Sequence, residues 1–525
     1  MKNKFYSAGF WSFFALLATA FYLTAVGSGG FWNMIVVAML LVASVLLPLS
    51  FTLPLFLSLI PFTFPAFRPY SDTLQLWRVL AVGLMVRYGL WLITTNSISR
   101  ESILLYLARL KTIWRSLPGW VLPSVLLLAL VLLTLPFSVS PKSSLVKLLF
   151  VLNASAIGIV TFLVFRHKVK SGILKAILVA CISILCLGYA QYAFATLTPI
   201  FDFWQYWAEV IIRNLYGGEL ASVVWYSNSW FTVNQGQLVL RMFSIMPDSH
   251  SFGLICVFGI TLLAYFLPTQ VGKKKLVNLV LSFLFALGLV FSGTRGVWVG
   301  MLVPLAVFLF LWLRKKELRS ALAVPLLAMT VVVSAFAVSP IIKVGIHYLY
   351  SGSSDDYFGR VRSIYDTNES SNAGRIAIWK ESARLSLRYP LGVGFGNFLE
   401  ARLGSGAGEN GISEKINRRY KLPEKYITAH SLYLQTLVEL GFVGLILLIW
   451  FFLSFLRSIY SSLSLALQAK NREATVFFTS IGFLSLWLMG FSVFDVTVYN
   501  DRILVLIMTC FALTLAYQLE GKKNA

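Results

Sequence analysis

Residues 428–455 read TAHSLYLQTLVELGFVGLILLIWFFLSF, and they join the one long polar segment of the chain to a long apolar run. About twenty apolar residues are enough to cross a bilayer as a helix. Lipid offers no hydrogen-bond partners, so backbone groups in such a run must be satisfied within a helix. This stretch predicts a membrane-spanning helix that starts directly after a histidine, His430.

The polar segment covers residues 341–430 and lies between two predicted spans. Loops of this length inside a compact architecture are usually functional or disordered. Part of the segment has helical patterning, with apolar residues at Ile376, Trp379, Ala383 and Leu385. We therefore expect a large external loop that contains helical structure and carries part of a site.

The composition excludes a soluble protein, because 58% of the 525 residues are hydrophobic and only 12% are charged. The short alternating segments of a transmembrane β-barrel are absent. The net charge of +23 lies largely in short loops between apolar runs. Nucleic-acid binding would need a soluble basic face with interleaved aromatic residues. We expect membrane lipids as partners, and no nucleic acid.

The apolar runs predict an all-α polytopic membrane protein with about 12–14 transmembrane helices. The first run follows Lys2 and Lys4 and continues to Val26, so we interpret it as a retained span rather than a signal peptide. The predicted spans are 9–27, 31–47, 51–65, 76–95, 120–137, 145–165, 173–197, 250–267, 275–291, 297–313, 321–339, 431–455, 474–495 and 501–518. The second and third are short and are compatible with one broken hairpin.

These spans divide the chain into five regions. Helices occupy 1–200, 250–340 and 431–525, an amphipathic external segment occupies 201–249, and the large loop occupies 341–430. Lysine and arginine clusters mark cytoplasmic loops. With this division the clusters near residues 2–4, 109–115, 166–170, 273–275, 314–319, 457–472 and 522–523 all fall on one side. Both termini are therefore predicted to be cytoplasmic.

Three arginines are then predicted on the outer side, where basic residues are disfavoured. Arg295 lies in the turn Ser292-Gly293-Thr294-Arg295-Gly296, where glycines allow close backbone approach and hydroxyls accompany a guanidinium group. Such groups suit a phosphate or diphosphate. Arg241 and Arg375 are the other two candidates for this anion site.

His430 is the candidate general base, because imidazole accepts protons near neutral pH. At about 100° per residue, Tyr433 lies on the same face of the predicted helix as His430, and Glu439 lies roughly opposite. His250, beside Asp248, is the second candidate base. An alternative interpretation of either histidine is a capping or interfacial role.

The sequence predicts no metal site and no cofactor. The four cysteines fall inside predicted spans without ligand spacing. Asp355 and Asp356 are adjacent and lie in a Ser/Gly-rich stretch. Gly392-Val393-Gly394-Phe395-Gly396 lacks the strand and helix context of a nucleotide loop, so we interpret it as a tight turn that returns the large loop to the membrane.

Taken together, these motifs resemble the O-antigen ligase and polymerase family of bacterial membrane glycosyltransferases. The similarity covers roughly residues 240–445. It rests on Arg241 before Pro247-Asp248-Ser249-His250, on the 292–296 turn, on Gly374-Arg375 with Trp379, on residues 392–398, and on Ala429-His430-Ser431-Leu432-Tyr433-Leu434 followed by Glu439-Leu440-Gly441.

The resemblance implies a GT-C-like helical fold in the bacterial inner membrane and metal-independent glycan transfer on the periplasmic side. It implies a polyprenyl diphosphate-linked glycan as donor. The implied acceptor is a glycan or a lipid A-core. His430 and Arg295 are implied to be catalytic, and the implied substrate-binding residues are Arg241, Arg375, Ser292, Thr294, Tyr433 and His250. Ligase and polymerase activities both stay open.

A transporter or flippase of lipid-linked glycans is the alternative class. Such a protein would favour ionisable residues buried in the middle of spans and helices broken at corresponding positions of two repeats. Arg78, Arg87 and Glu439 are the candidates for such residues. No internal repeat is evident in the pattern of spans, which favours the enzyme.

Overall fold

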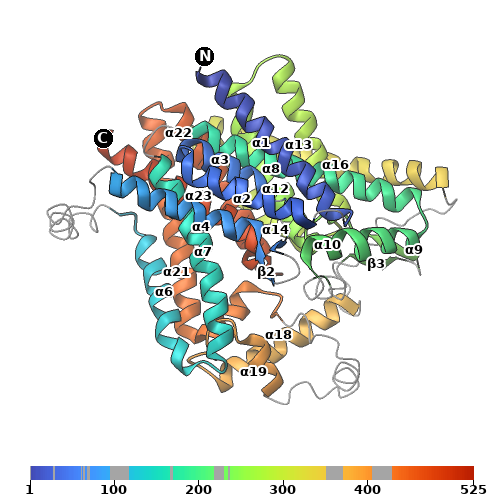
Figure 1. Cartoon of the computed structure of the whole chain (residues 1–525). Helices are drawn as coiled ribbons and strands as arrows, with labels where there is room; N and C mark the ends of the chain where they lie inside the picture. Colours follow the sequence, from blue (N-terminus) through green and yellow to red (C-terminus); the bar gives the residue numbers. More distant parts are fainter. Residues whose placement is uncertain are drawn as a thin grey trace.

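The structure is a computed structural model that describes residues 2–27, 30–60, 62, 65–67, 71–94, 117–165, 170–217, 221, 230–234, 237–350, 370–404 and 428–524. These residues form a mainly helical bundle (Figure 1). The Asp355-Asp356 pair of the large loop lies outside the described residues. The start of α1 and the end of α23 lie at the end of the bundle away from α18 and α19 (Figure 1).

Each predicted span coincides with a helix, which confirms the all-α polytopic fold. The first seven are α1 (Lys2–Ala25), α2 (Gly30–Leu46), α3 (Leu49–Leu59), α4 (Leu76–Thr94), α6 (Val121–Thr134), α7 (Pro141–Phe165) and α8 (Lys170–Leu197). The others are α12 (Ser249–Phe266), α13 (Lys273–Phe291), the pair α14 (Arg295–Gly300) and α15 (Leu302–Arg314), α16 (Arg319–Tyr350), α21 (Leu432–Gln468), α22 (Arg472–Phe491) and α23 (Asp501–Asn524).

Length and composition support the membrane assignment. Within the described part of the chain, nine helices are long and apolar enough to cross a membrane, and four further apolar helices of 10–17 residues accompany them. The span after the basic 314–319 cluster is longer than predicted, because α16 continues as a helix to Tyr350. The nine long helices alone are fewer than the expected 12–14 spans. The expected number is reached only if the four shorter apolar helices also cross the membrane.

Two short antiparallel hairpins were not predicted. The first pairs β1 (Pro65–Phe67) with β2 (Ser71–Gln75), and the second pairs β3 (Phe231–Asn234) with β4 (Gln237–Leu240). The second hairpin follows a helical segment made of α9 (Ile200–Phe203), a π-helical stretch Trp204–Ile212 and α10 (Arg213–Tyr216). Aromatic side chains hold the two together, since the Phe231 ring lies 6.2 Å from the Phe203 ring and 6.4 Å from the Trp204 ring, measured between centroids.

The central helices are buried on nearly all sides. α12 packs against α8, α13 and α22, and its residues Phe252, Leu254 and Cys256 have no exposed surface. An all-round apolar helix of this kind belongs in the interior of a bundle. Its N-terminus is capped by Asp248, whose carboxylate accepts a hydrogen bond from the Ser251 amide at 2.6 Å. The interior position of α12 therefore places its first residues at the centre of one end of the bundle.

Helix α21 is broken at Gly441, which has φ 68° and ψ −169°. The chain at 390–394 fills the break and pairs with the freed backbone. Val393 N donates to Val438 O at 3.0 Å, Gly394 N to Glu439 O at 2.9 Å and Phe442 N to Pro390 O at 3.1 Å. The glycine-rich segment is therefore not a simple turn. It threads into a span and fixes the large loop to the bundle.

The large loop contains two described helices, α18 (Ser370–Arg388) and α19 (Phe398–Gly404). α18 confirms the helix that the Ile376, Trp379 and Leu385 pattern predicted. Both lie at one end of the bundle, beyond the ends of α6, α7 and α21 (Figure 1). Asn397, just before α19, donates to Ser144 Oγ at 2.6 Å and accepts from Ser140 N at 2.8 Å. These bonds dock the loop on the start of α7.

Candidate functional site

Arg241 and the 292–296 turn, predicted separately, lie in contact. Arg241 Nε donates to Ser292 O at 3.1 Å, and Nη2 lies 3.4 Å from Thr294 Oγ1. Arg241 directly follows β4, and Arg295 is the first residue of α14. The Arg241 side chain therefore contacts the turn that Arg295 follows, and convergence of the two guanidinium groups stays a prediction.

The hydroxyls of this turn form hydrogen bonds within the protein. Ser292 and Thr294 are fully buried. Ser292 Oγ donates to Leu289 O at 2.6 Å, and Thr294 Oγ1 donates to Ser249 O at 3.1 Å. The second bond ties the turn to the first residue of α12. In this geometry the two residues position the turn, and their contact with a diphosphate stays a prediction.

An aspartate links the two predicted histidines. Asp495 Oδ2 lies 3.7 Å from His250 Nε2 and 3.9 Å from His430 Nδ1. On the other side of His250, Nδ1 lies 3.8 Å from Asp248 Oδ1. These separations are slightly too long for direct hydrogen bonds. The four side chains form a row, Asp248–His250–Asp495–His430, at the end of the bundle where α12 begins and α22 ends.

Asp495 is held rigidly after the end of α22. Its Oδ1 accepts hydrogen bonds from Val496 N at 2.7 Å, Thr497 N at 3.0 Å and Thr497 Oγ1 at 2.5 Å. Oδ2 is thereby left to face the histidines. Burial by itself raises the pKa of Asp495, but His250, His430 and the Thr497 hydroxyl outweigh burial, so its pKa lies well below the ordinary value. The carboxylate is therefore charged at neutral pH.

Asp248 has the opposite shift. Burial raises its pKa to about 6, an effect that the hydrogen bonds from Ser251 oppose and the nearby Asp495 charge reinforces. Two carboxylates in one site thus titrate in different ranges. Such separation between neighbouring acids is a feature of catalytic sites, although structural networks produce it as well.

His430 lies outside the helix that follows it. Its backbone has φ 45°, a left-handed conformation that is uncommon for a residue other than glycine. The flanking residues hold this conformation, because Ala429 N donates to Gln435 Oε1 at 2.8 Å and Leu432 N donates to Ser492 O at 2.8 Å. The second bond joins the histidine segment to the end of α22, close to Asp495.

The helical-face argument for His430 is therefore wrong. Helix α21 starts at Leu432 with Ser431 as its N-cap, so the 100° rotation per residue does not extend back to His430. Tyr433 lies on α21, and its hydroxyl donates to Met489 O at 3.1 Å. The tyrosine thus ties α21 to α22, and its role in substrate binding stays a prediction.

The His430 side chain is partly buried. Nδ1 is buried without a hydrogen-bond partner among the described residues, whereas the side chain as a whole is 30% exposed. The exposed part of the side chain therefore does not include Nδ1, and contact of Nε2 with a ligand stays a prediction.

Helix α18 brings the third arginine. The positive charges of Arg241 and Arg375 and the ring of His430 all act electrostatically on His250. Trp379 lies one helical turn after Arg375, and its ring centroid is 6.4 Å from that of Phe494. The face of α18 that carries Arg375 and Trp379 therefore approaches the segment that holds Asp495.

Sequence reasoning missed Asp495, because residues 474–495 were predicted as one span and the residue counted as its last position. The signal that could have found it is an aspartate at the outer end of a span, followed by the polar stretch Thr497-Val498-Tyr499-Asn500. Glu439, which was judged an unlikely partner for His430, pairs instead with Lys147 at 3.2 Å and accepts from Gly396 N at 2.8 Å.

No metal centre is found in the part of the chain that the structure describes, since no group of three or more His, Cys, Asp or Glu side chains there could hold an ion. The positive charge near the row of acids and histidines comes from the arginines Arg241 and Arg375. This chemistry suits an anionic ligand.

Residues 280–449 match a protein-family model described as O-antigen ligase. The match confirms the resemblance over this region, which includes the 292–296 turn, α18 and His430. The chain is also similar to an "Uncharacterized protein" of Haemophilus influenzae, with 27% identity over 203 residues, which cover 37% of this chain and 46% of that protein. The chain thus spans about half the length of this curated relative.

Proposed function

We propose that this chain is a membrane glycosyltransferase of the O-antigen ligase and polymerase type. It transfers a glycan from a polyprenyl diphosphate-linked donor to a sugar hydroxyl, on the periplasmic face of the bacterial inner membrane. The observation that carries the proposal is Asp495, whose Oδ2 lies between His250 and His430 at 3.7 and 3.9 Å. The match to the O-antigen ligase family over residues 280–449 supports it.

In this proposal the arginines bind the diphosphate. Arg241 is anchored on the 292–296 turn by its contacts with Ser292 and Thr294, and Arg375 acts on the same histidine as Arg241. Arg295 opens α14 next to Thr294. Fixed cations of this kind stabilise the charge that develops on a leaving diphosphate. No divalent metal is needed for that charge in this proposal.

His430 is the general base. Its Nε2 takes the proton from the acceptor hydroxyl while that oxygen attacks the anomeric carbon of the donor. The bond from the anomeric carbon to the diphosphate breaks in the same step, and polyprenyl diphosphate leaves with the electron pair. Attack opposite the leaving group inverts the anomeric centre. Asp495 stabilises the protonated ring through Nδ1, after the two groups, 3.9 Å apart, approach by roughly 1 Å to hydrogen-bonding distance.

The transporter alternative depended on ionisable residues in the spans, and each of these has a structural partner. Arg78 Nη2 pairs with Asp501 Oδ2 at 2.7 Å, Arg87 Nε donates to Leu47 O at 3.1 Å, and Glu439 pairs with Lys147. These contacts connect α4 to α23, α4 to the end of α2, and α21 to α7. They are contacts between helices, so these residues have a structural role in the bundle.

The test is transfer in vitro with purified protein and a defined lipid-diphosphate oligosaccharide. Two acceptors, a core lipid and a second lipid-linked repeat, are offered separately, which distinguishes a ligase from a polymerase. His430→Ala should bind the donor normally and transfer 10²–10⁴-fold more slowly, the range typical for loss of a general base. His250→Ala should have a milder effect.

If the His430→Ala variant transferred glycan at the wild-type rate at a subsaturating donor concentration, His430 would not be the general base. The candidate general base would then be His250, with Asp248 as its neighbouring carboxylate. Failure of the wild-type protein to transfer to either acceptor, while it moves the intact donor across liposomes, would favour the flippase.

A further inference from the structure

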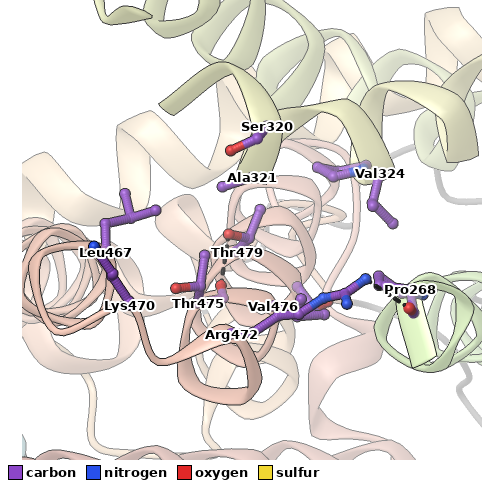
Figure 2. A pocket seen from close by; sticks show the side chains of 12 residues that line it. Pro268, Ser320, Ala321, Val324, Leu467, Lys470, Arg472, Thr475, Val476 and Thr479 are labelled. Atoms are coloured by element: carbon purple, nitrogen blue, oxygen red, sulfur yellow. Dashed lines mark hydrogen bonds between the residues drawn. The ribbon is translucent and has the colours of Figure 1, made fainter. Parts of the chain in front are cut away.

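A cavity of about 410 Å³ lies at the opposite end of the bundle from the candidate site. α16, the end of α21 and the start of α22 surround it, together with Pro268 just beyond α12 (Figure 2). α22 has 20 residues and runs from this cavity towards Asp495. At 1.5 Å per residue the two sites are therefore about 30 Å apart, and the cavity has no part in the proposed transfer chemistry.

Two cations stand at the mouth of this cavity. Lys470 lies in the turn between α21 and α22, and Arg472 is the first residue of α22. Arg472 Nη2 donates to Pro268 O at 2.7 Å, and Figure 2 shows this side chain reaching across towards Pro268 while Lys470 lies beside Leu467. Both residues are exposed, and no carboxylate is among the residues that line the cavity. The mouth is therefore electropositive.

The backbone of Lys470 has a conformation that normally selects glycine. Its φ is 53°, and its amide donates to Leu467 O at 3.0 Å, as at the left-handed end of many helices. A side chain in this conformation is disfavoured relative to ordinary helical backbone. The lysine therefore offers no advantage to the turn itself, and the positive charge at the cavity mouth is a separate property of the position.

The interior of the cavity is mixed. The Thr475 and Thr479 hydroxyls donate to the carbonyls of Asn471 and Thr475, both at 2.8 Å, so their oxygens are left as acceptors. The Ser320 and Ser480 side chains add two more hydroxyl groups to the lining. Val324, Leu467 and other apolar side chains form the rest of the wall.

We propose that this cavity binds the headgroup of an anionic phospholipid from the membrane leaflet opposite to the candidate site. The phosphate lies at the mouth of the cavity, where Lys470 and Arg472 supply the positive charge, the hydroxyls contact the polar part of the headgroup, and the first acyl segment follows the apolar wall. Basic pockets between membrane helices recognise anionic lipid headgroups in this way. A soluble anion would leave the apolar wall uncovered, which is why a lipid fits better.

The test measures lipid binding to the purified full-length chain by native mass spectrometry. Phosphatidylglycerol and phosphatidylcholine with identical acyl chains are titrated separately. The wild type should prefer phosphatidylglycerol. The double variant Lys470→Gly, Arg472→Gln should lose about tenfold or more of that affinity, given the typical contribution of each basic residue near a membrane surface. Glycine suits the φ of residue 470, so this variant should fold.

Two further variants distinguish lipid binding in the cavity from non-specific electrostatic attraction of the lipid to basic residues. Ala321→Phe keeps both charges, fills the cavity, and should also lower phosphatidylglycerol binding. Lys273→Gln with Lys275→Gln removes the same charge at exposed positions that do not line the cavity, and should change the affinity by less than about twofold.

Any of three results would overturn the proposal. The two lipids could bind with equal affinity, the cavity variants could bind as the wild type does, or the Lys273/Lys275 control could lose as much affinity as the cavity variants. Displacement of the lipid by free glycerol 3-phosphate at matched affinity would also overturn it, because the ligand would then be a soluble phosphate ester.

Discussion

At the scale of single residues, the site depends on one carboxylate oxygen that two histidines share. Asp495 Oδ1 is occupied by three hydrogen bonds from residues 496 and 497, so only Oδ2 is directed at the rings. A carboxylate oriented in this way can hold an imidazole in one tautomer and stabilise its protonated form. The negative charge of Asp495 at neutral pH is part of that role.

Asp495→Asn tests this role as a positioning residue. The amide keeps an oxygen for the 496 and 497 donors and removes the charge. Transfer should fall substantially, by about 10²-fold or more. Because Asp495 acts through His430, the double variant with His430→Ala should be no slower than His430→Ala alone. If the rate loss of the double variant equalled the product of the two single losses, the coupling would be contradicted. An unchanged thermal midpoint of Asp495→Asn would show that its rate loss does not come from misfolding.

The raised pKa of Asp248 predicts a specific dependence of folding stability on pH. Its pKa in the folded protein, about 6, lies above the ordinary value of 3.8, so the folded state binds this proton more tightly than the unfolded chain does. The contribution to stability is present in full below pH 3.8 and is lost as the pH rises towards 6. Asp248→Asn removes this titration while its amide oxygen still caps α12.

The measurement is the thermal midpoint in detergent at several values between pH 4 and pH 7. Wild-type protein should lose more stability over this range than Asp248→Asn. Parallel curves for the two proteins would show that Asp248 titrates at its ordinary pKa in the folded state.

At the scale of elements, the break in α21 determines where the large loop attaches. Gly441 interrupts the helix, and Gly392 and Gly394 lie within its gap at φ values of 89° and 98°. The backbones approach too closely for side chains, since a Cβ on Gly441 would lie 2.3 Å from Pro390 O. Glu439, 1% exposed, adds a hydrogen bond to Gly396 and an ion pair with Lys147.

Gly441→Ala should therefore be strongly destabilising. The substitution combines a backbone conformation that essentially only glycine adopts, which costs roughly 1–3 kcal/mol for another residue, with a collision against backbone that cannot move aside. Because α18 reaches the site through this junction, transfer activity should fall together with stability. Gly482→Ala in α22 is the matched control, since its Cβ would meet Ile459 at an ordinary 3.5 Å. Equal thermal midpoints for the two variants would contradict the account.

At the scale of the whole molecule, the helix order separates two ends. The row of acids and histidines lies where α12 starts, α13 ends, α21 starts and α22 ends. The basic clusters at 273–275 and 470–472 lie at the other end of these helices, and the 314–319 cluster joins α15 to α16. This separation matches the asymmetry that orients membrane proteins. We therefore expect the site to face the periplasm.

Single cysteines at exposed positions test this orientation. Leu391→Cys lies near the site end and Lys274→Cys at the basic end, and both native side chains are exposed. In a background without the native cysteines, a membrane-impermeant reagent should label residue 391 in cells with a permeabilised outer membrane. Residue 274 should react only after the inner membrane is opened. The reverse pattern would invert the topology and place the transfer reaction in the cytoplasm.

What the sequence determined by itself was the set of helices and the residue types of the site. Apolar runs in lipid have few alternatives to a helix, which is why every predicted span, from 9–27 to 501–518, coincides with one. The helix at Ser370–Arg388 was predictable for a different reason, the local periodicity of its apolar residues. His430, His250 and Arg241 were found because charged or titratable residues at the ends of spans are conspicuous in so apolar a chain.

Only the tertiary structure decided how these residues combine. The row from Asp248 to His430 joins residues 182 positions apart through Asp495, and its geometry depends on α12 and α22 packing side by side. The left-handed backbone of His430 and the break at Gly441 depend on contacts with Ser492 and with residues 390–394. Local propensity predicted one continuous helix there. Backbone hydrogen bonds from a distant segment overrode it, and such bonds leave no periodic pattern in the sequence.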